Sequence, residues 1–171
     1  MHMSRVAVIG SGGSGKSYVA RELGRLLDAP VTHLDAVYYD DEWTPLPAEK
    51  FETIQRELVA EPRWVIDGNY NSTLHVRLQA CDTVILVDVP TVAALWGVLS
   101  RQARHGAGQH DAGVYNRINW SFVRYVASYR RRMRPQVLAK IRQHTRDSTQ
   151  IVVLRSRAHA RRWLEQVAAG R

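Results

Sequence analysis

The eight residues GSGGSGKS, at positions 10–17, constrain the fold of this chain more than any other stretch. They follow a short apolar run, RVAVI, and precede YVARELGRLLDA, whose apolar residues recur at helical spacing. The pattern G-x-x-x-x-G-K-[ST] between a buried strand and a helix predicts a loop whose N–H groups surround a phosphate. A flexible glycine–serine linker is the alternative, and a linker has no reason to occupy this position.

This phosphate loop, residues 10–17, supplies most of the expected nucleotide contacts. Its glycines let the main chain turn toward an anion, and the helix that starts near Gly15 directs its positive end to the same point. Lys16 is expected to reach the β- and γ-phosphates of ATP, and the Ser17 hydroxyl to bind Mg²⁺. The predicted ATP-binding residues are Gly10, Ser11, Gly12, Gly13, Ser14, Gly15, Lys16, Ser17, Tyr18 and, from a turn near the C-terminus, Arg155.

Five short apolar segments rich in Val, Ile and Leu predict strands that are buried on both faces. They are Arg5–Ile9, Val31–Leu34, Trp64–Asp67, Thr83–Asp88 and Gln150–Leu154. Helical stretches alternate with them: Lys16–Leu27, Ala48–Ala60, Leu74–Gln79, Val92–His105, Trp120–Met133, Gln136–His144 and Ala158–Ala168, with Pro135 expected to break or kink the chain between two of these. Strand–helix alternation predicts an α/β fold of the P-loop NTPase class, with a five-stranded parallel sheet flanked by helices on both faces, in one domain over residues 1–171.

The bulk sequence favours a cytoplasmic protein. No apolar run approaches the length of a membrane span, and no signal peptide is expected. Cys81 is the only cysteine, which suits a reducing compartment. We expect Cys81 to be a small buried side chain, with a reactive thiol as the alternative.

Charge is distributed unevenly along the chain. Residues 1–100 hold 8 Lys and Arg against 13 Asp and Glu, whereas residues 101–171 hold 16 against 3. Such asymmetry indicates that the second half binds an anion, and both nucleic acid and nucleotide phosphates are candidates.

A glycine-rich stretch in the second half predicts a lid. Residues 106–116, GAGQHDAGVYN, contain three glycines, and arginines flank them on both sides. In a phosphate-binding protein this pattern predicts a lid, over about residues 101–135, that closes on phosphates. Arg101 and Arg104 are its catalytic candidates, expected to stabilise charge on a transferring phosphoryl group. A surface loop with no such role is the alternative.

Acidic residues follow three of the predicted strands, at the sheet edge where open α/β sheets bind ligands. Asp35 could orient or deprotonate an acceptor hydroxyl, or it could serve an Asx turn or a helix N-cap. Asp67, at the end of WVID, suits a metal role through water, and the predicted metal ligands are therefore Ser17 and Asp67. Asp88 could share that role or could hydrogen-bond the phosphate loop, and we favour the second, structural role.

The remaining candidates surround the acceptor. Gly68 would let a substrate approach the backbone, and Asn69 and Tyr70 could contact it. Arg77 lies within reach in sequence and could hold an anionic group of the acceptor. The predicted substrate-binding residues are Asp35, Asp67, Gly68, Asn69, Tyr70 and Arg77.

The motifs GSGGSGKS, HLDAVYY, WVIDGNY and VDVP together resemble the P-loop proteins called adenylate kinase-related or DNA topology modulation proteins, and more distantly the nucleoside monophosphate kinases. The resemblance covers almost the whole chain. It implies the five-stranded parallel fold, binding of ATP and Mg²⁺, and an arginine-bearing lid.

Two departures from the kinase pattern bear on the acceptor. The DGNY segment occupies the place of the D-G-F-P-R motif of adenylate kinases, and Tyr70 and Asn71 stand where their arginine grips the acceptor phosphate. We therefore expect AMP to be a poor acceptor. The HLD segment is closer to shikimate- and gluconate-type kinases, in which an Asp meets the acceptor hydroxyl, and this assigns that role to Asp35. Tyr18 stands where Thr is usual, next to an intact Ser17.

The leading hypothesis is a small ATP-dependent phosphotransferase in which Lys16, Asp35, Arg101 and Arg104 act on an unidentified hydroxyl or phosphate acceptor. A nucleotide-gated nucleic-acid-binding protein is an alternative, because RYVASYRRRMR mixes arginine with tyrosine. An ATP-binding regulator without transfer is another, since its phosphate loop would look the same. Either a monomer or a homodimer is compatible with the sequence.

Overall fold

The computed structural model describes residues 3–40, 42, 44–105, 108–110, 114–116 and 120–170. At positions 101, 102, 104, 105, 108–110 and 114–116 the description covers the backbone only.

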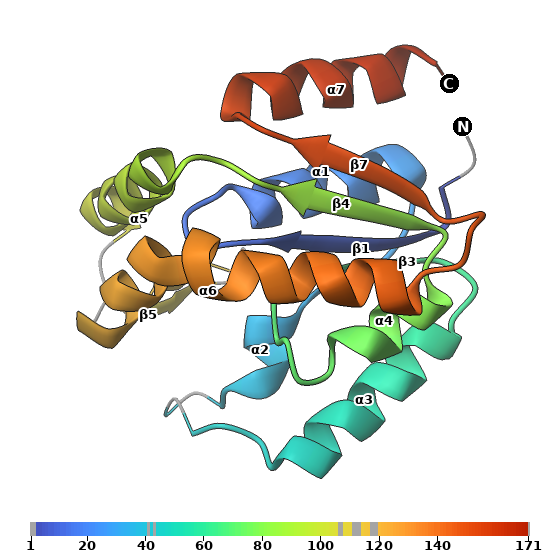
Figure 1. Cartoon of the computed structure of the whole chain (residues 1–171), viewed down its shortest axis with the longest axis horizontal. Coiled ribbons are helices and arrows are strands. Elements are labelled where there is room, and N and C mark those ends of the chain that lie inside the picture. The colour runs from blue at the N-terminus through green and yellow to red at the C-terminus, as the bar shows by residue number, and fades with distance from the viewer. Residues whose placement is uncertain are drawn as a thin grey trace.

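A parallel sheet of five strands forms the centre of the molecule (Figure 1). Its strands are β1 (Arg5–Gly10), β2 (Val31–His33), β3 (Trp64–Asp67), β4 (Thr83–Val87) and β7 (Gln150–Leu154), in the spatial order β2-β3-β1-β4-β7. Every pairing is parallel, as short apolar strands separated by helices require. The predicted five-stranded parallel sheet is confirmed. Because the strands are parallel, their carboxyl ends lie at the same edge of the sheet.

Helices cover both faces of this sheet. They are α1 (Lys16–Leu27), α2 (Leu34–Tyr38), α3 (Ala48–Ala60), α4 (Leu74–Ala80), α5 (Thr91–His105), α6 (Trp120–His144) and α7 (Arg157–Ala169). In Figure 1, α6 (orange) crosses in front of the strands, whereas α1 (blue) lies behind them.

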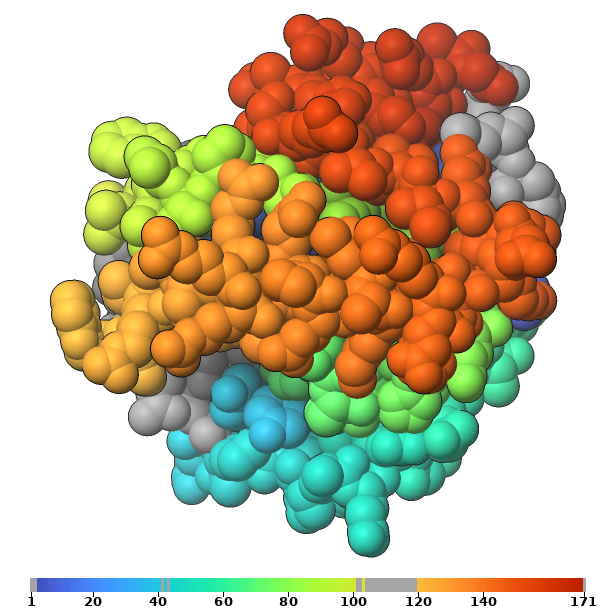
Figure 2. All heavy atoms as spheres, in the orientation of Figure 1, coloured from blue at the N-terminus to red at the C-terminus, as the bar shows by residue number. Residues whose placement is uncertain are grey.

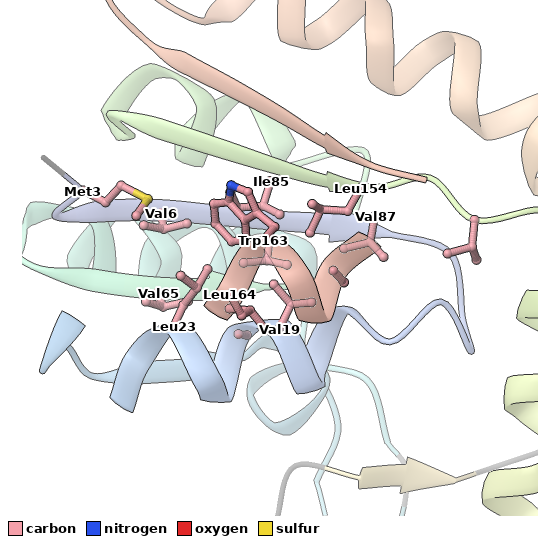
Figure 3. Close-up of a cluster of buried hydrophobic side chains, with 14 of the residues drawn as sticks. Met3, Val6, Val19, Leu23, Val65, Ile85, Val87, Leu154, Trp163 and Leu164 are labelled. Atoms are coloured by element: carbon pink, nitrogen blue, oxygen red, sulfur yellow. The ribbon is translucent and has the colours of Figure 1, made fainter. Parts of the chain in front are cut away.

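Two apolar clusters result from the alternation of side chains along β1. Val6 and Val8 point into a cluster with α1 and α7, where Leu23 and Trp163 are buried (Figure 3). The opposite side chains of the strands pack against α3, α4 and α6. Cys81 belongs to this second cluster, and burial raises the pKa of its thiol to about 12. The expectation of a buried Cys81 is confirmed, since its side chain is 0% exposed.

Helix α6 differs from the expected pair of helices separated by Pro135. It is one helix of 25 residues with Pro135 inside it. Proline removes one backbone donor and strains the preceding turn, so tertiary packing has to compensate. Buried side chains on both sides of the proline supply that packing, with Val126 and Tyr129 before it and Val137 and Ile141 after it. The prediction of a break at Pro135 is therefore wrong.

Three short elements were not expected. Helix α2 starts directly after β2 and has 5 residues, which is too short for an apolar periodicity to reveal. Strands β5 (Gly108–His110) and β6 (Val114–Asn116) pair antiparallel within the stretch expected to be a loop. The rest of the predicted lid loop, at 106, 107 and 111–113, lies outside the described residues.

On the face shown in Figure 2, the side chains of α6 (orange) extend across the middle of the molecule. Within the described part of the chain, no helix combines the length and apolar character needed to cross a bilayer.

Candidate functional site

The phosphate loop connects β1 to α1 at the edge where the strands end. Gly13 and Gly15 adopt positive φ angles of 72° and 95°, and Gly15 is the N-cap of α1. These are conformations that residues with a Cβ rarely adopt, which explains the glycines of the motif. Lys16 and Ser17 begin α1, so its positive end and the Lys16 side chain are brought to the same place.

Later elements of the chain pack tightly against this loop. A Cβ at Gly12 would approach Phe122 Cζ of α6 to 2.5 Å, and a Cβ at Gly13 would collide with the carbonyl oxygen of Ala94 in α5. The glycines therefore serve close packing as well as loop conformation. The shape of the phosphate loop depends on helices that follow it by about a hundred residues.

Arg157 has a role in the site that the sequence did not reveal. Its Nη2 donates to the carbonyl oxygens of Gly13, at 3.0 Å, and Ala93, at 3.2 Å. Gly97 makes room for it, because a Cβ there would collide with Arg157 Nη2. When the N–H groups of a phosphate loop point inward, its carbonyls point outward, and Arg157 satisfies one of them. Arg155, the residue expected near the nucleotide, is exposed, and its backbone N–H donates to His159 Nδ1.

Asp67 ends β3 beside the phosphate loop. Its side chain is buried, and its Oδ1 lies 2.8 Å from His33 Nδ1 of β2. Burial alone would raise its pKa, but the hydrogen bond to His33, the charge of Lys16 and the Ser17 hydroxyl together lower the pKa below its ordinary value of 3.8. Asp67 is therefore a carboxylate at neutral pH, close to the two loop residues expected to hold ATP and Mg²⁺.

The donor set around Asp67 suits Mg²⁺. Asp67 Oδ2 is buried and has no hydrogen-bond partner within the described residues. A buried carboxylate oxygen without a partner is costly, and a hydrated cation would satisfy it. Mg²⁺ is usually held by one or two protein oxygens together with phosphates and water, and Asp67 and Ser17 supply that kind of set.

Asp35 lies in the first turn of α2, directly after the end of β2. The Tyr70 hydroxyl donates to Asp35 Oδ1 at 2.6 Å. Burial is the largest cause of a strongly raised pKa for Tyr70, and the neighbouring Asp35 carboxylate adds to it, so Tyr70 stays neutral and remains a donor. The structure gives no hydrogen bond to Asp35 Oδ2 within the described part of the chain, which leaves that oxygen for another partner.

Residues 68–70, the segment that follows β3, form a connecting loop, and Arg77 of α4 supports it. Arg77 is 0% exposed and donates to the carbonyl oxygens of Gly68 and Asn69, at 2.6 and 3.0 Å. Burial lowers its pKa to about 10, so it remains a cation at neutral pH. A buried guanidinium with both ends bound to backbone does not meet a ligand. The expectation that Arg77 holds an acceptor is therefore corrected: Arg77 is a support of the connecting loop.

Gly68 and Asn69 also have roles other than the expected substrate contacts. Gly68 has a φ of 140°, and a Cβ there would approach Leu34 Cβ to 2.9 Å, so the glycine admits α2. Asn69 Oδ1 accepts from the Gly10 N–H at 3.1 Å, and its Nδ2 donates to the Tyr125 hydroxyl of α6 at 2.7 Å. The connecting loop is thus bound to three parts of the site. Asn69 links it to the phosphate loop and to α6, and Tyr70 links it to the Asp35 side chain.

Asp88, after β4, accepts from Arg134 Nε and Nη2 at 2.9 and 2.8 Å, and Arg130 lies 3.7 Å away. This pairing is the structural role favoured by the sequence, although its partner is α6 and not the phosphate loop.

The lid candidates stay predictions. Arg101 and Arg104 belong to the last turns of α5, but their side chains lie outside the described residues.

Searches of protein-family models and of curated protein sequences find no match to this chain. Solved structures do resemble it. One is a shikimate kinase from Acinetobacter baumannii in complex with shikimate, with a TM-score of 0.60 and 16% identity over 96% of this chain and 90% of that one. Another is a shikimate kinase from Bacteroides thetaiotaomicron, with a TM-score of 0.56 and 13% identity over 98% of both chains.

A gluconokinase from Sinorhizobium meliloti 1021 also matches, with a TM-score of 0.51 and 14% identity over 98% of this chain and 94% of that one. At these identities the comparison establishes the fold. The adenylate kinase-related family suggested by the motifs stays a prediction, whereas the P-loop kinase fold is shared with structures of this kind along nearly the whole chain.

Proposed function

We propose that this protein transfers the γ-phosphoryl group of ATP to a hydroxyl group of a small molecule. The observation that carries the proposal is the arrangement at one sheet edge of Lys16 and Ser17 beside Asp67, with Asp35 held by Tyr70 on the adjacent strand end. Phosphoryl transfer to a hydroxyl requires residues that hold the phosphates and a base that accepts the hydroxyl proton. Lys16, Ser17 and Asp67 would hold the phosphates with their metal ion, and Asp35 would be the base. The fold shared with shikimate and gluconate kinases supports the proposal.

In this proposal the acceptor oxygen attacks the γ-phosphorus, and the bond between that phosphorus and the oxygen that stays with ADP breaks. The proton of the acceptor hydroxyl passes to Asp35 Oδ2. Lys16 stabilises the charge on the transferring group, and Asp67 and Ser17 hold Mg²⁺, which would neutralise charge on the phosphates. Arg101 and Arg104 are proposed to add positive charge from the lid.

Turnover with a panel of hydroxyl compounds tests the proposal. We expect Asp35→Asn, which keeps the shape but removes the base, to reduce kcat by roughly 10²-fold or more while ATP binding is retained. Lys16→Ala should abolish most ATP affinity because a charge-assisted contact is lost, whereas Lys50→Ala, at an exposed lysine of α3, should not. Equal kcat in wild type and Asp35→Asn would contradict the role of Asp35. Equal ATP affinity in wild type and Lys16→Ala would contradict the phosphate loop assignment.

Nucleic-acid binding is the second candidate, favoured by one observation. Arg124, Arg130, Arg131 and Arg132 of α6 are exposed, and arginine contacts to phosphates make affinity depend on salt. Fluorescence anisotropy with labelled DNA at several salt concentrations distinguishes the candidates. ATP-dependent, salt-sensitive binding without phosphoryl transfer to any acceptor would favour this function over the kinase.

A further inference from the structure

We propose that the acceptor of this site is a hydroxyl compound that carries no negatively charged group. The inference rests on the proposed function, and it names the class of substrate that the surroundings of Asp35 admit. It is carried by the charges around Asp35 and by the partners that the nearby cations already have.

The described neighbours of Asp35 include aromatic rings, and the surrounding sequence is acidic. Tyr38, Phe51 and Tyr70 pack against one another with ring centroids 4.8–4.9 Å apart, and Tyr70 binds Asp35 directly. Residues 31–80 hold nine Asp and Glu against four Lys and Arg. An anion placed beside Asp35 would therefore meet a carboxylate first.

The cations nearest to the connecting loop are already bound by the protein. Arg77 is fully buried on two backbone carbonyls. Lys140 of α6 donates to the carbonyl oxygen of Asn71 at 2.5 Å, and Arg134 is paired with Asp88. His33 is bound to Asp67. Lys16 has its expected task at the phosphates of ATP.

The remaining arginines of this half lie on surfaces with partners of their own. Arg56 pairs with Glu52 at 2.6 Å along α3, and His75 lies 3.9 Å from the same carboxylate. Arg63, before β3, donates to the carbonyl oxygen of Leu27 at the opposite edge of the sheet. Lys50, exposed in the first turn of α3, is the one cation of residues 31–80 for which the described structure shows no partner.

These charges decide between classes of acceptor. An arginine or lysine that is not committed elsewhere is a common partner of a carboxylate or phosphate, and a like charge at close range opposes binding. A neutral hydroxyl compound needs only the hydrogen bond to Asp35. Specificity against anions would thus come from the repulsive carboxylate and from the partners that the described cations of residues 31–80, apart from Lys50, already have.

Matched pairs of acceptors test the inference: adenosine with AMP, glucose with gluconate, and methyl shikimate with shikimate. ADP release is measured for each compound, with ATP hydrolysis in buffer as the baseline. In the pair with the highest activity we expect the neutral member to have a kcat/KM roughly tenfold or more above that of its anionic partner. Equal or higher kcat/KM for the anionic member would overturn the inference while the proposed kinase function stands.

A binding measurement provides a readout that does not depend on turnover. Asp35→Asn removes the like charge, so calorimetric affinity for the anionic member should rise relative to the neutral one, with ATP analogue bound. If the affinity ratio stays at its wild-type value, Asp35 does not select against anions and the inference fails. An anionic preference that disappears in Lys50→Gln would also overturn it, by identifying the cation that binds the charge. Absence of transfer to every acceptor, with ATP bound, would refute the proposed function itself.

Discussion

The two sides of the site are built in opposite ways. The phosphate loop has a recognisable motif, but distant parts of the chain hold its shape: Arg157, 144 residues away, binds Gly13, and α5 and α6 pack against its glycines. The acceptor side has no comparable motif, yet a local contact supports it, because Arg77 binds carbonyls only 8 and 9 residues earlier. A strong sequence signal therefore marks the chemistry of a segment and does not imply that its conformation is local.

The largest effect is expected from removing the local support. Arg77→Met leaves two buried carbonyls without their donor, and we expect the free energy of unfolding to fall by about 3 kcal/mol. Arg56→Met is the matched control, since that exposed pair with Glu52 should contribute less than about 0.5 kcal/mol. Urea unfolding measures both. Equal losses in the two variants would mean that Arg77 does not support the connecting loop.

The long-range support should have a more selective effect. Arg157→Met removes the donor to the Gly13 carbonyl, and we expect the Kd for ATP to rise roughly tenfold, the equivalent of about 1.4 kcal/mol. Arg155→Met, at the exposed position nearby, should leave it unchanged. Calorimetric titration with ATP and with pyrophosphate separates base from phosphate contacts. The opposite result, with only Arg155→Met impaired, would restore the original assignment of Arg155.

Asp67 lies between the phosphate loop and the acceptor side, and the pH dependence of the free energy of unfolding tests its role. Because the folded protein lowers the pKa of Asp67, this carboxylate contributes stability above its ordinary value of 3.8, and the contribution is lost as pH falls through the folded pKa. In the Asp67→Asn variant this position has an amide, which does not ionise in this pH range. The difference in unfolding free energy between wild type and Asp67→Asn should therefore narrow on going from pH 7 toward pH 3. A constant difference over that range would show that Asp67 is not selectively stabilised as a carboxylate.

The smallest effect concerns the link from the connecting loop to α6. Tyr125→Phe removes one hydrogen bond to Asn69 and should reduce stability by about 1 kcal/mol or less. If the link matters for the site, Tyr125→Phe alone should raise the Kd for ATP, and adding it to Asn69→Ala should raise the Kd no further, because both substitutions break the same path to Gly10. Strict additivity of the two substitutions would mean that Tyr125 and the phosphate loop are not coupled through Asn69.

Sequence periodicity and motif spacing predicted the sheet and the phosphate loop because the sequence signals for both are local. Short apolar strands and a glycine pattern can be read directly along the chain. The contact of Arg157 with the phosphate loop could not be predicted, since it requires the last strand to lie beside β4 and requires a glycine at 97 to leave space.

Arg77 was assigned to the wrong partner for a related reason. Sequence places it near the connecting loop but does not say whether it faces the ligand or the backbone. Burial decides that question, and burial depends on how α4 packs against the sheet.

The uninterrupted course of α6 through Pro135 has a mechanical consequence. Proline at 135 cannot donate to the carbonyl of residue 131, so this position has the lowest bending stiffness of the helix. The segment after it packs in the core through Val137 and Ile141, and the segment before it packs through Val126 and Tyr129 and touches the phosphate loop through Phe122. A tilt of the first segment about residue 135 would therefore also move Phe122 against Gly12 of the phosphate loop.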